Sequence, residues 1–404
     1  MKLSEELMYR GFVAQNTFRD ISDLDKGEFV LYIGTDPSGD SLHIGHLAAQ
    51  MLARNFLEHG HKIILVAGGG TGMVGDPRDT EERELISIDT LNANKAKIVR
   101  QMEKIWGGRK FEVVDNYDWL KELNYLEFLR DIGKQFSMGQ MIDREHFKAR
   151  VGEGKPGMTY AEFSYALIQA YDYLWLHRNR GVNLQIGGSD QWGNILSGVD
   201  LIRKLDGDEV HAFTFPLVID KTTGRKFGKT ESGDGVWLDP KKTSPYQFYQ
   251  YWLNTGDEDV IDYLKLFTLL PHEEIEELAE SQRANPAGRA AQKRLALEVT
   301  TIVHDLETAT NVAHVSSVLF GDEDVRDLPA AGLDLLSETI PTVPRGTKIV
   351  EALTKSGLAD SNSEALRLIK QNAISINGQK VTADSEVSQI SLIKKGKNNF
   401  VLVR

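Results

Sequence analysis

Two histidines about one helical turn apart are the first residues that suggest chemistry. The tetrapeptide His43-Ile44-Gly45-His46 follows a loop and lies at a predicted helix start, where backbone N–H groups and the helix dipole attract anions. Imidazole donates hydrogen bonds to phosphate oxygens, and Gly45 lets a nucleotide approach the backbone closely. Two capping histidines on an ordinary helix would give the same tetrapeptide. A metal site is disfavoured because no third ligand lies nearby in the sequence.

A second group of cations lies in the hexapeptide Arg225-Lys226-Phe227-Gly228-Lys229-Thr230, after a strand-like run at 213–219. Lys226 and Lys229 flank a flexible glycine, and mobile ammonium groups suit a phosphoryl centre whose negative charge grows in the transition state. Taken alone, this spacing is more typical of a solvated turn. Its occurrence together with the histidine tetrapeptide favours phosphate chemistry.

A helix predicted over about 159–177 has a polar face. Tyr165, Gln169 and Asp172 are spaced i, i+4, i+7 and therefore share one side of that helix. Asp172 stands between two tyrosines, and a carboxylate in aromatic surroundings is suited to accept a hydrogen bond from a hydroxyl. The same spacing also fits the solvent-facing side of an amphipathic helix.

The pattern around the histidines predicts a β-α-β unit that would position them. An apolar run at 29–33 indicates a buried strand, a helical pattern runs from 44 to a stop at Gly60, and a second strand follows at 62–67. A further strand is predicted at 182–186. Because parallel strands joined by helices bind ligands at the carboxyl ends of the strands, we expect the loops that follow them to contact a ligand.

The rest of the chain changes in character twice. From about residue 240 to 318 the pattern is mainly helical, and residues 321–346 contain three prolines among small and acidic residues, as in a linker. The final residues, 341–404, carry ten Lys/Arg against five Asp/Glu. They are predicted to form a small basic module of two helices, near 348–354 and 362–371, followed by short strands.

Composition excludes several classes of protein. A chain of 404 residues corresponds to two or three domains, and a hydrophobic content of 41% is that of a globular protein. The net charge of −12 makes any nucleic-acid contact local. Without cysteine there are no disulfides, thiolate nucleophiles or cysteine-bound metals. No export signal or bilayer-spanning run is visible, so we expect a cytoplasmic protein.

Four stretches together resemble the bacterial tyrosyl-tRNA synthetases, a family of class I aminoacyl-tRNA synthetases: 32–46, 163–172, 184–194 and 226–232. The resemblance covers essentially the whole chain in the same order, including a basic tail similar to the RNA-binding fold named for ribosomal protein S4. It implies an α/β protein. The expected parts are a Rossmann-like parallel-sheet catalytic domain (1–222), the KFGKT loop with an α-helical domain (223–320), a linker (321–340) and a small α+β S4-like RNA-binding domain (341–404).

The resemblance also implies an activity. Members activate L-tyrosine with ATP to tyrosyl-adenylate and pyrophosphate, then transfer tyrosine to the 3′-terminal adenosine of tRNA(Tyr). ATP would be a substrate, with Mg²⁺ carried on its phosphates and no separate metal site. A homodimer without membrane association is expected. The chemistry agrees, because a carboxylate already ionised at pH 7 needs alignment and charge stabilisation rather than a general base.

By position, the resemblance assigns site residues in three groups. The catalytic group is His43, His46, Lys226, Lys229 and Thr230. The tyrosine-binding group is Tyr32, Thr71, Asp76, Asn116, Tyr165, Gln169, Asp172 and Gln191, in which Tyr32 and Asp172 would bind the phenol. The ATP-binding group is Gly34, Asp36, His43, Gly45, His46, Gly188, Asp190, Lys226 and Lys229. Several relatives carry lysine in the loop where this chain has Arg78 and Arg83, and either arginine could reach the pyrophosphate.

Three alternatives compete with this interpretation. A tryptophanyl-tRNA synthetase shares the fold, but an indole has only an N–H donor and gives no reason for the pair Tyr32 and Asp172. Another nucleotidyltransferase would not need an RNA-binding tail. An RNA-binding or RNA-folding protein that has lost catalysis would not need to retain both histidines and both lysines.

Overall fold

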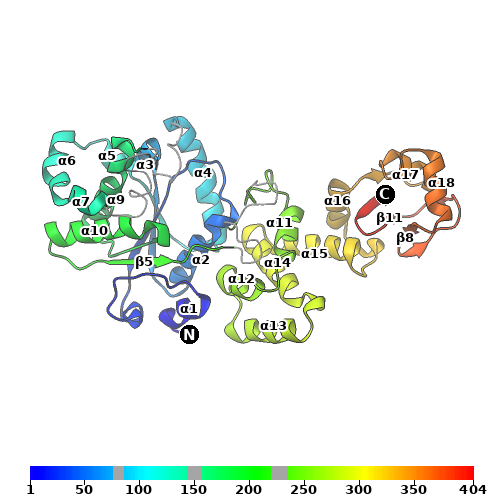
Figure 1. The fold of residues 1–404 in the computed structure, drawn as a ribbon, viewed down its shortest axis with the longest axis horizontal. Helices are drawn as coiled ribbons and strands as arrows, with labels where there is room; N and C mark the ends of the chain where they lie inside the picture. The colour runs from blue at the N-terminus through cyan, green and yellow to red at the C-terminus, as the bar shows by residue number, and fades with distance from the viewer. Residues whose placement is uncertain (76–85, 143–156, 220–226, 228–234) are drawn as a thin grey trace. The chain divides into compact units, whose positions relative to one another are not determined.

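The computed structural model describes residues 1–75, 86–142, 157–219, 227 and 235–404. The chain divides into two compact units, Met1–Lys242 with Gly256–Ala291, and Thr243–Thr255 with Gln292–Arg404 (Figure 1). Within the described ranges, no helix combines the length and the apolar character that a bilayer crossing requires.

A five-stranded parallel sheet forms the centre of the first unit, in the order β3-β2-β1-β4-β5. Its strands are β1 (Val30–Thr35), β2 (Lys62–Ala67), β3 (Glu112–Asp115), β4 (Leu184–Gly188) and β5 (His211–Phe215). From β1 the chain adds β2 and then β3 on one side of the sheet, and from β4 it adds β5 on the other side. This makes the boundary between β1 and β4 a topological switch point, the place where such sheets bind ligands. The predicted α/β class and parallel sheet are confirmed.

Helices cover both faces of this sheet (Figure 1). Helices α2 (Ile44–Glu58) and α4 (Ile88–Ile105) lie on one face, and α9 (Tyr160–Arg180) and α10 (Trp192–Leu205) pack together on the other, as right-handed crossovers require. A Thr159/Glu162 capping box begins α9, and Gly181 ends it with φ 67°. The other α-helices among the described residues of this unit are α1 (Leu3–Arg10), α3 (Gly69–Val74), α5 (Tyr117–Leu120), α6 (Tyr125–Asp131), α7 (Met138–Ile142), α12 (Val260–Phe267) and α13 (His272–Ala284).

The core beneath α9 holds the aromatic residues that fix the site. The rings of Tyr32 and Tyr173 meet edge to face with centroids 5.3 Å apart, and the Tyr173 hydroxyl donates to the His211 carbonyl at 2.8 Å. Trp119 stacks on Trp175 at 4.2 Å. Because these rings are packed on several sides, the neighbouring polar side chains of β1 and α9 have little freedom to move.

The second unit combines helices with small sheets. Its helices are α11 (Pro245–Leu253), most of α14 (Ala290–Val303), α15 (Leu306–Phe320), α16 (Ala330–Thr339), α17 (Ile349–Lys355) and α18 (Asn362–Lys370). The main sheet has the order β6-β12-β11-β8-β9, and β7 pairs with β10. The strands are β6 (Thr342–Val343), β7 (Thr347–Lys348), β8 (Ile374–Ile376), β9 (Gln379–Lys380), β10 (Glu386–Val387), β11 (Ser391–Lys395) and β12 (Asn399–Val403).

Two local features differ from the sequence prediction. The segment 321–340, predicted as a linker, contains the helix α16, whose Leu333 and Leu336 are buried against α15 and the C-terminal sheet. Pro329 favoured the linker prediction, but it is the N-cap residue just before the first turn of α16, where a proline does not interrupt the helix. Strand β5 ends at Phe215 rather than 219, since the next residue is a proline, which cannot donate to the ladder.

Candidate active site

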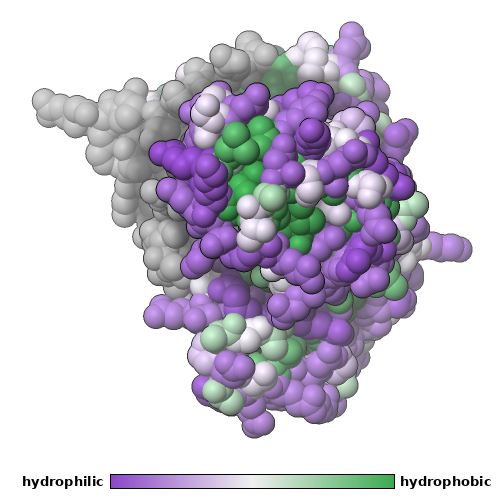
Figure 2. Space-filling view, turned by 90° about the vertical axis from the view of Figure 1, so that its right-hand side faces the viewer, coloured by the Kyte–Doolittle hydropathy of each residue, from purple (hydrophilic) through white to green (hydrophobic). Residues whose placement is uncertain are grey.

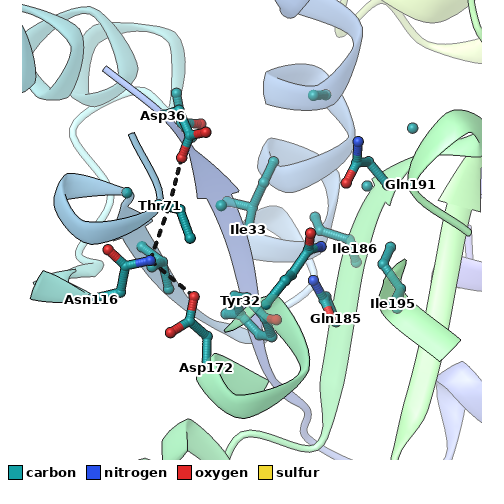
Figure 3. Close-up of a pocket in the computed structure, with 18 of the residues that line it drawn as sticks. Tyr32, Ile33, Asp36, Thr71, Asn116, Asp172, Gln185, Ile186, Gln191 and Ile195 are labelled. Atoms are coloured by element: carbon teal, nitrogen blue, oxygen red, sulfur yellow. Dashed lines mark hydrogen bonds between the residues drawn. The ribbon is translucent and has the colours of Figure 1, made fainter. Parts of the chain in front are cut away.

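A cavity of about 320 Å³ opens at the carboxyl ends of β1 and β4 (Figure 3). Its volume lies in the range of small-molecule sites. The structure brings together on its wall eleven of the residues predicted from the sequence: Tyr32, Gly34, Asp36, His46, Thr71, Asn116, Tyr165, Gln169, Asp172, Gly188 and Gln191. They come from strands and helices that are far apart in the sequence, so the cavity is a product of the fold.

Asp172 is buried in the wall of this cavity, with its side chain held by two donors. Its Oδ2 accepts from Asn116 Nδ2 at 2.9 Å and its Oδ1 from Trp119 Nε1 at 2.7 Å. Burial raises the pKa of the Asp172 carboxyl to about 7, although both hydrogen bonds act to lower it. Asp36 and Asp115 add a smaller increase through charge repulsion.

Tyr32 has a hydroxyl group that no described residue satisfies. The side chain is buried, and its oxygen has no hydrogen-bond partner among the described residues. Burial, followed by the charge of Asp172, raises the pKa of the Tyr32 phenol well above its usual range, so the group stays protonated. A buried hydroxyl without a partner is costly, which indicates that a ligand completes it.

A chain of hydrogen bonds links Asp172, at the end of the cavity that contains Tyr32, to Asp36 (Figure 3). Tyr165 OH and Thr71 Oγ1 donate to the two oxygens of Asp36, at 3.0 and 2.7 Å. Asn116 Nδ2 lies 3.0 Å from Thr71 Oγ1 and also donates to Asp172. The resemblance placed Asp36 among the ATP contacts, whereas here it bonds two residues assigned to tyrosine. A Cβ on Gly68 would lie 2.0 Å from Asp36 Oδ1, so only glycine allows this arrangement.

The two histidines begin helix α2 and use the same ring atom for local bonds. Nδ1 of His43 accepts from the Gly45 N–H at 3.0 Å, and Nδ1 of His46 accepts from the His43 N–H at 3.2 Å. In the neutral rings the proton is therefore assigned to Nε2, which makes each Nε2 a donor. His46 is exposed to solvent on the cavity side, but desolvation by the protein atoms packed around it, followed by the nearby His43 ring, lowers its pKa. His46 is thus a neutral donor near pH 7.

Phe227, within the hexapeptide 225–230, and Val236, which follows it, lie against the histidine motif. The Phe227 carbonyl oxygen is 3.4 Å from the position of a Cβ on Gly45, and the Phe227 ring stacks on Phe267 at 5.1 Å. The Ile44 N–H donates to the Val236 carbonyl at 2.9 Å. Lys226, Lys229, Thr230, Asp76, Arg78 and Arg83 lie outside the described residues. His43, Gly45 and the exposed Asp190 lie beside the cavity rather than on its wall.

Comparison with known proteins agrees with this geometry. The family model described as tRNA synthetases class I (W and Y) matches residues 24–321, and the one described as the tyrosine–tRNA ligase SYY-like C-terminal domain matches 336–404. The tyrosine–tRNA ligase of Corynebacterium diphtheriae is 43% identical over 420 residues, covering 100% of this chain and 99% of that protein. The chain belongs to the tyrosyl-tRNA synthetase family. The tyrosine–tRNA ligase of Limosilactobacillus reuteri is 42% identical and covers 100% of both chains.

Solved structures support membership of the tyrosyl-tRNA synthetase family. A C-terminally truncated mitochondrial tyrosyl-tRNA synthetase from Aspergillus nidulans superposes with a TM-score of 0.69 at 30% identity, covering 79% of this chain and 94% of that one. A tryptophanyl-tRNA synthetase from Plasmodium falciparum has a TM-score of 0.54 at 16% identity, covering 83% of this chain and 89% of that one, and shares the fold alone. As a class I tRNA synthetase, the protein uses ATP as a substrate.

Sequence reasoning missed two residues at this cavity, Trp119 and Gln185. Trp119 holds Asp172 but was not predicted, although it closely follows the carboxyl end of β3, where ligand-proximal residues are expected. Gln185 is the register partner of Tyr32, and its Oε1 is buried without a partner among the described residues. The rule that partners in parallel strands share a face of the sheet would have found it once the register was known.

The raised pKa of Asp172 predicts a pH dependence of stability. The folded protein keeps this proton up to about pH 7, whereas an unfolded aspartate loses it near 3.8. The folded state therefore binds more protons in this window, and the free energy of unfolding falls as pH rises. Relative to Asp172→Asn, the wild-type value should fall by roughly 4 kcal/mol between pH 4 and pH 8, as measured by urea unfolding.

Asp324→Asn is the matched control. Hydrogen bonds from Arg326 lower the pKa of Asp324 to about 2, so this variant should follow the wild type over the same range. Parallel pH profiles of wild type and Asp172→Asn would show that the buried carboxyl does not titrate in this window.

Proposed function

We propose that this protein activates L-tyrosine with ATP and transfers it to tRNA(Tyr). The observation that carries the proposal is the unsatisfied Tyr32 hydroxyl in the same cavity as the buried Asp172 carboxyl. A phenol can donate to Asp172 and accept from Tyr32 at once. An indole N–H can only donate, and phenylalanine can do neither. The pair therefore favours tyrosine over both other aromatic amino acids.

The neighbouring polar groups suit the backbone of the same substrate. Tyr165, Gln169 and Asp36 line the cavity with Thr71, and their oxygens favour the α-ammonium group. The tyrosine carboxylate would then lie toward β4, near Gln191, where it can reach the nucleotide. Because that carboxylate is already ionised at pH 7, the enzyme needs to align it rather than deprotonate it.

The nucleotide would place its phosphates at the start of α2. There, the carboxylate oxygen attacks the α-phosphorus, the bond to the bridging oxygen of the β-phosphate breaks, and pyrophosphate leaves. The Nε2 donors of His43 and His46 would stabilise the charge that develops on the phosphate oxygens. In the second step, a terminal ribose hydroxyl of tRNA attacks the carbonyl carbon and AMP leaves.

The lysine-containing hexapeptide 225–230 is proposed to complete this charge stabilisation. Lys226, Lys229 and Thr230 would contact the phosphates, supported by the position of Phe227 against Gly45. We also propose that Asp76 joins the ammonium contacts, and that Gly34, Gly45, Gly188 and Asp190 contact the nucleotide. Mg²⁺ binds oxygen ligands and keeps several waters, so the ATP phosphates can carry it; the described ranges hold no group of three or more His, Asp or Glu side chains arranged for a metal ion.

Tyr32→Phe tests whether the Tyr32 hydroxyl recognises the phenol of the substrate. Removing one hydroxyl should raise KM for tyrosine in ATP–pyrophosphate exchange by about tenfold, the value of one hydrogen bond, and should reduce the preference for tyrosine over phenylalanine. Tyr173→Phe is the control, since its equally buried hydroxyl donates to the His211 carbonyl and should affect stability without changing selectivity. An unchanged tyrosine preference in Tyr32→Phe would contradict the assignment.

We propose that residues 341–404 bind tRNA in the cytoplasm, following a catalytic part at 1–222 and a helical part at 223–320, with 321–340 joining them. Eight of the ten basic side chains in 341–404 are exposed. Five of these form no ion pair with a described residue: Arg345, Lys348, Lys370, Lys380 and Lys397. In the view of Figure 2, hydrophilic side chains surround a smaller apolar area. Free cations on a hydrophilic surface suit contacts with phosphates.

The double variant Lys370→Glu with Lys380→Glu tests this role. We expect KM for tRNA to rise about tenfold and the salt dependence of charging to weaken, because phosphate contacts are lost. Tyrosine-dependent exchange without tRNA should not change. Lys26→Glu with Lys62→Glu changes the charge equally in the first unit and should leave tRNA charging unaffected; an equal loss in both double variants would refute local binding by the tail.

We propose that the protein is a homodimer. Five large apolar side chains are exposed on α6, α7 and the start of α9: Tyr125, Leu126, Met138, Ile142 and Tyr160. The hydroxyls of Tyr125 and Tyr160 lie 3.3 Å apart, so residues from α6 and α9 meet at this surface. Exposed apolar groups gathered in this way are typical of subunit interfaces.

Leu126→Asp should therefore give a monomer in sedimentation experiments, because it places a charge where 72% of an apolar side chain is exposed. Leu306→Asp, at a position 63% exposed in the second unit, should leave the wild-type mass unchanged. A dimer that persists in Leu126→Asp, or a monomeric wild type, would overturn the proposed interface.

A further inference from the structure

Gln50 is a buried amide in the cavity wall that has no role in the reaction proposed above. It lies on α2 four residues after His46, so the two side chains share one face of the helix. Both residues, with Ala49, line the cavity. Gln50 is only 2% exposed, and its Oε1 is buried without a hydrogen-bond partner among the described residues.

Two buried amides of α2 and α4 that do not line the cavity are satisfied by the protein, whereas Gln169 and Gln185 on the cavity wall, like Gln50, have an Oε1 without a partner among the described residues. On the same helix, Asn55 Nδ2 donates to the Met51 carbonyl at 2.8 Å, and Asn94 Nδ2 of α4 donates to the Pro37 carbonyl at 3.0 Å. The only described hydrogen bond of Gln50 outside the helix ladder uses its backbone carbonyl, which accepts from Trp106 Nε1. A buried amide is costly without partners, so the partner of this side chain is expected to come from a ligand.

The position of Gln50 favours a contact with the nucleotide rather than with tyrosine. Tyr32 packs in the core with Tyr173 of α9, and the next residue, Ile33, points to the opposite face of the sheet, which α2 covers. Gln50 is therefore on the side of the cavity opposite the phenol site. It lies about 6 Å further along α2 than His46, at a rise of 1.5 Å per residue.

The group at that distance from the phosphates is the ribose. We propose that the Gln50 carboxamide hydrogen-bonds a ribose hydroxyl of ATP and of tyrosyl-adenylate, and so contributes to selection of a ribonucleotide. A hydroxyl both donates and accepts, so it can pair with either end of the amide. This inference rests on the proposed position of ATP phosphates at the start of α2.

The test is tyrosine-dependent ATP–pyrophosphate exchange with ATP, 2′-deoxy-ATP and 3′-deoxy-ATP. Gln50→Met keeps a long unbranched side chain but removes the amide. We expect it to raise KM for ATP about tenfold while KM for tyrosine stays the same. In the wild type, one deoxy analogue should bind about tenfold more weakly than ATP, and in Gln50→Met that difference should disappear, as a double-mutant cycle requires for a direct contact.

Two results would overturn the proposal: a wild-type KM for ATP in Gln50→Met, or the same loss with each deoxy analogue in both proteins. Gln282→Met is the structural control, because Gln282 is also buried with an unpartnered Oε1 but does not line this cavity; it should leave KM for ATP unchanged. If Gln50→Met does not fold, Gln50→Glu retains an acceptor and must keep the preference for ATP. Absence of exchange in the wild type would instead refute the proposed function.

Discussion

The burial of one carboxyl group, that of Asp172, is the constraint on which the site depends. Moving a carboxyl group out of water is costly unless donors surround it, and here Asn116 and Trp119 each supply one. Asn116 can do so because its own oxygen accepts from the Gly70 N–H at 2.8 Å. The turns after β2 and β3 must therefore meet the middle of α9, and their packing fixes the end of the cavity that holds Tyr32.

The other end of the cavity uses a different kind of stabilisation. The start of α2 offers backbone N–H groups and two imidazoles whose Nδ1 atoms are occupied by local hydrogen bonds. Donors held in this way can stabilise charge as it develops, and the lowered pKa of His46 keeps that ring neutral, so it does not repel nearby cations. The cavity thus has an acceptor end, at Asp172 and Asp36, and a donor end, at α2. This polarity matches a substrate with a phenol and an ammonium at one end and a nucleotide at the other.

The sequence predicted those parts of the site that follow a local period. The spacing of Tyr165, Gln169 and Asp172 placed them on one helix face, and all three line the cavity. The β-α-β unit around the histidines was also predicted, because its strands and helix have clear patterns. Trp119 was missed because its contact with Asp172 joins residues 53 positions apart, and no local pattern reports such a pair. The helix α16 was missed because its stability comes from packing on the C-terminal sheet.

The measurement that tests this account most directly is ATP–pyrophosphate exchange without tRNA, with tyrosine, tryptophan and phenylalanine compared side by side. An acceptor carboxyl and a free hydroxyl in one buried cavity predict exchange with tyrosine alone. Comparable exchange with tryptophan or phenylalanine would show that Tyr32 and Asp172 do not recognise the phenol of the substrate. Exchange with none of the three would contradict amino-acid activation at this cavity.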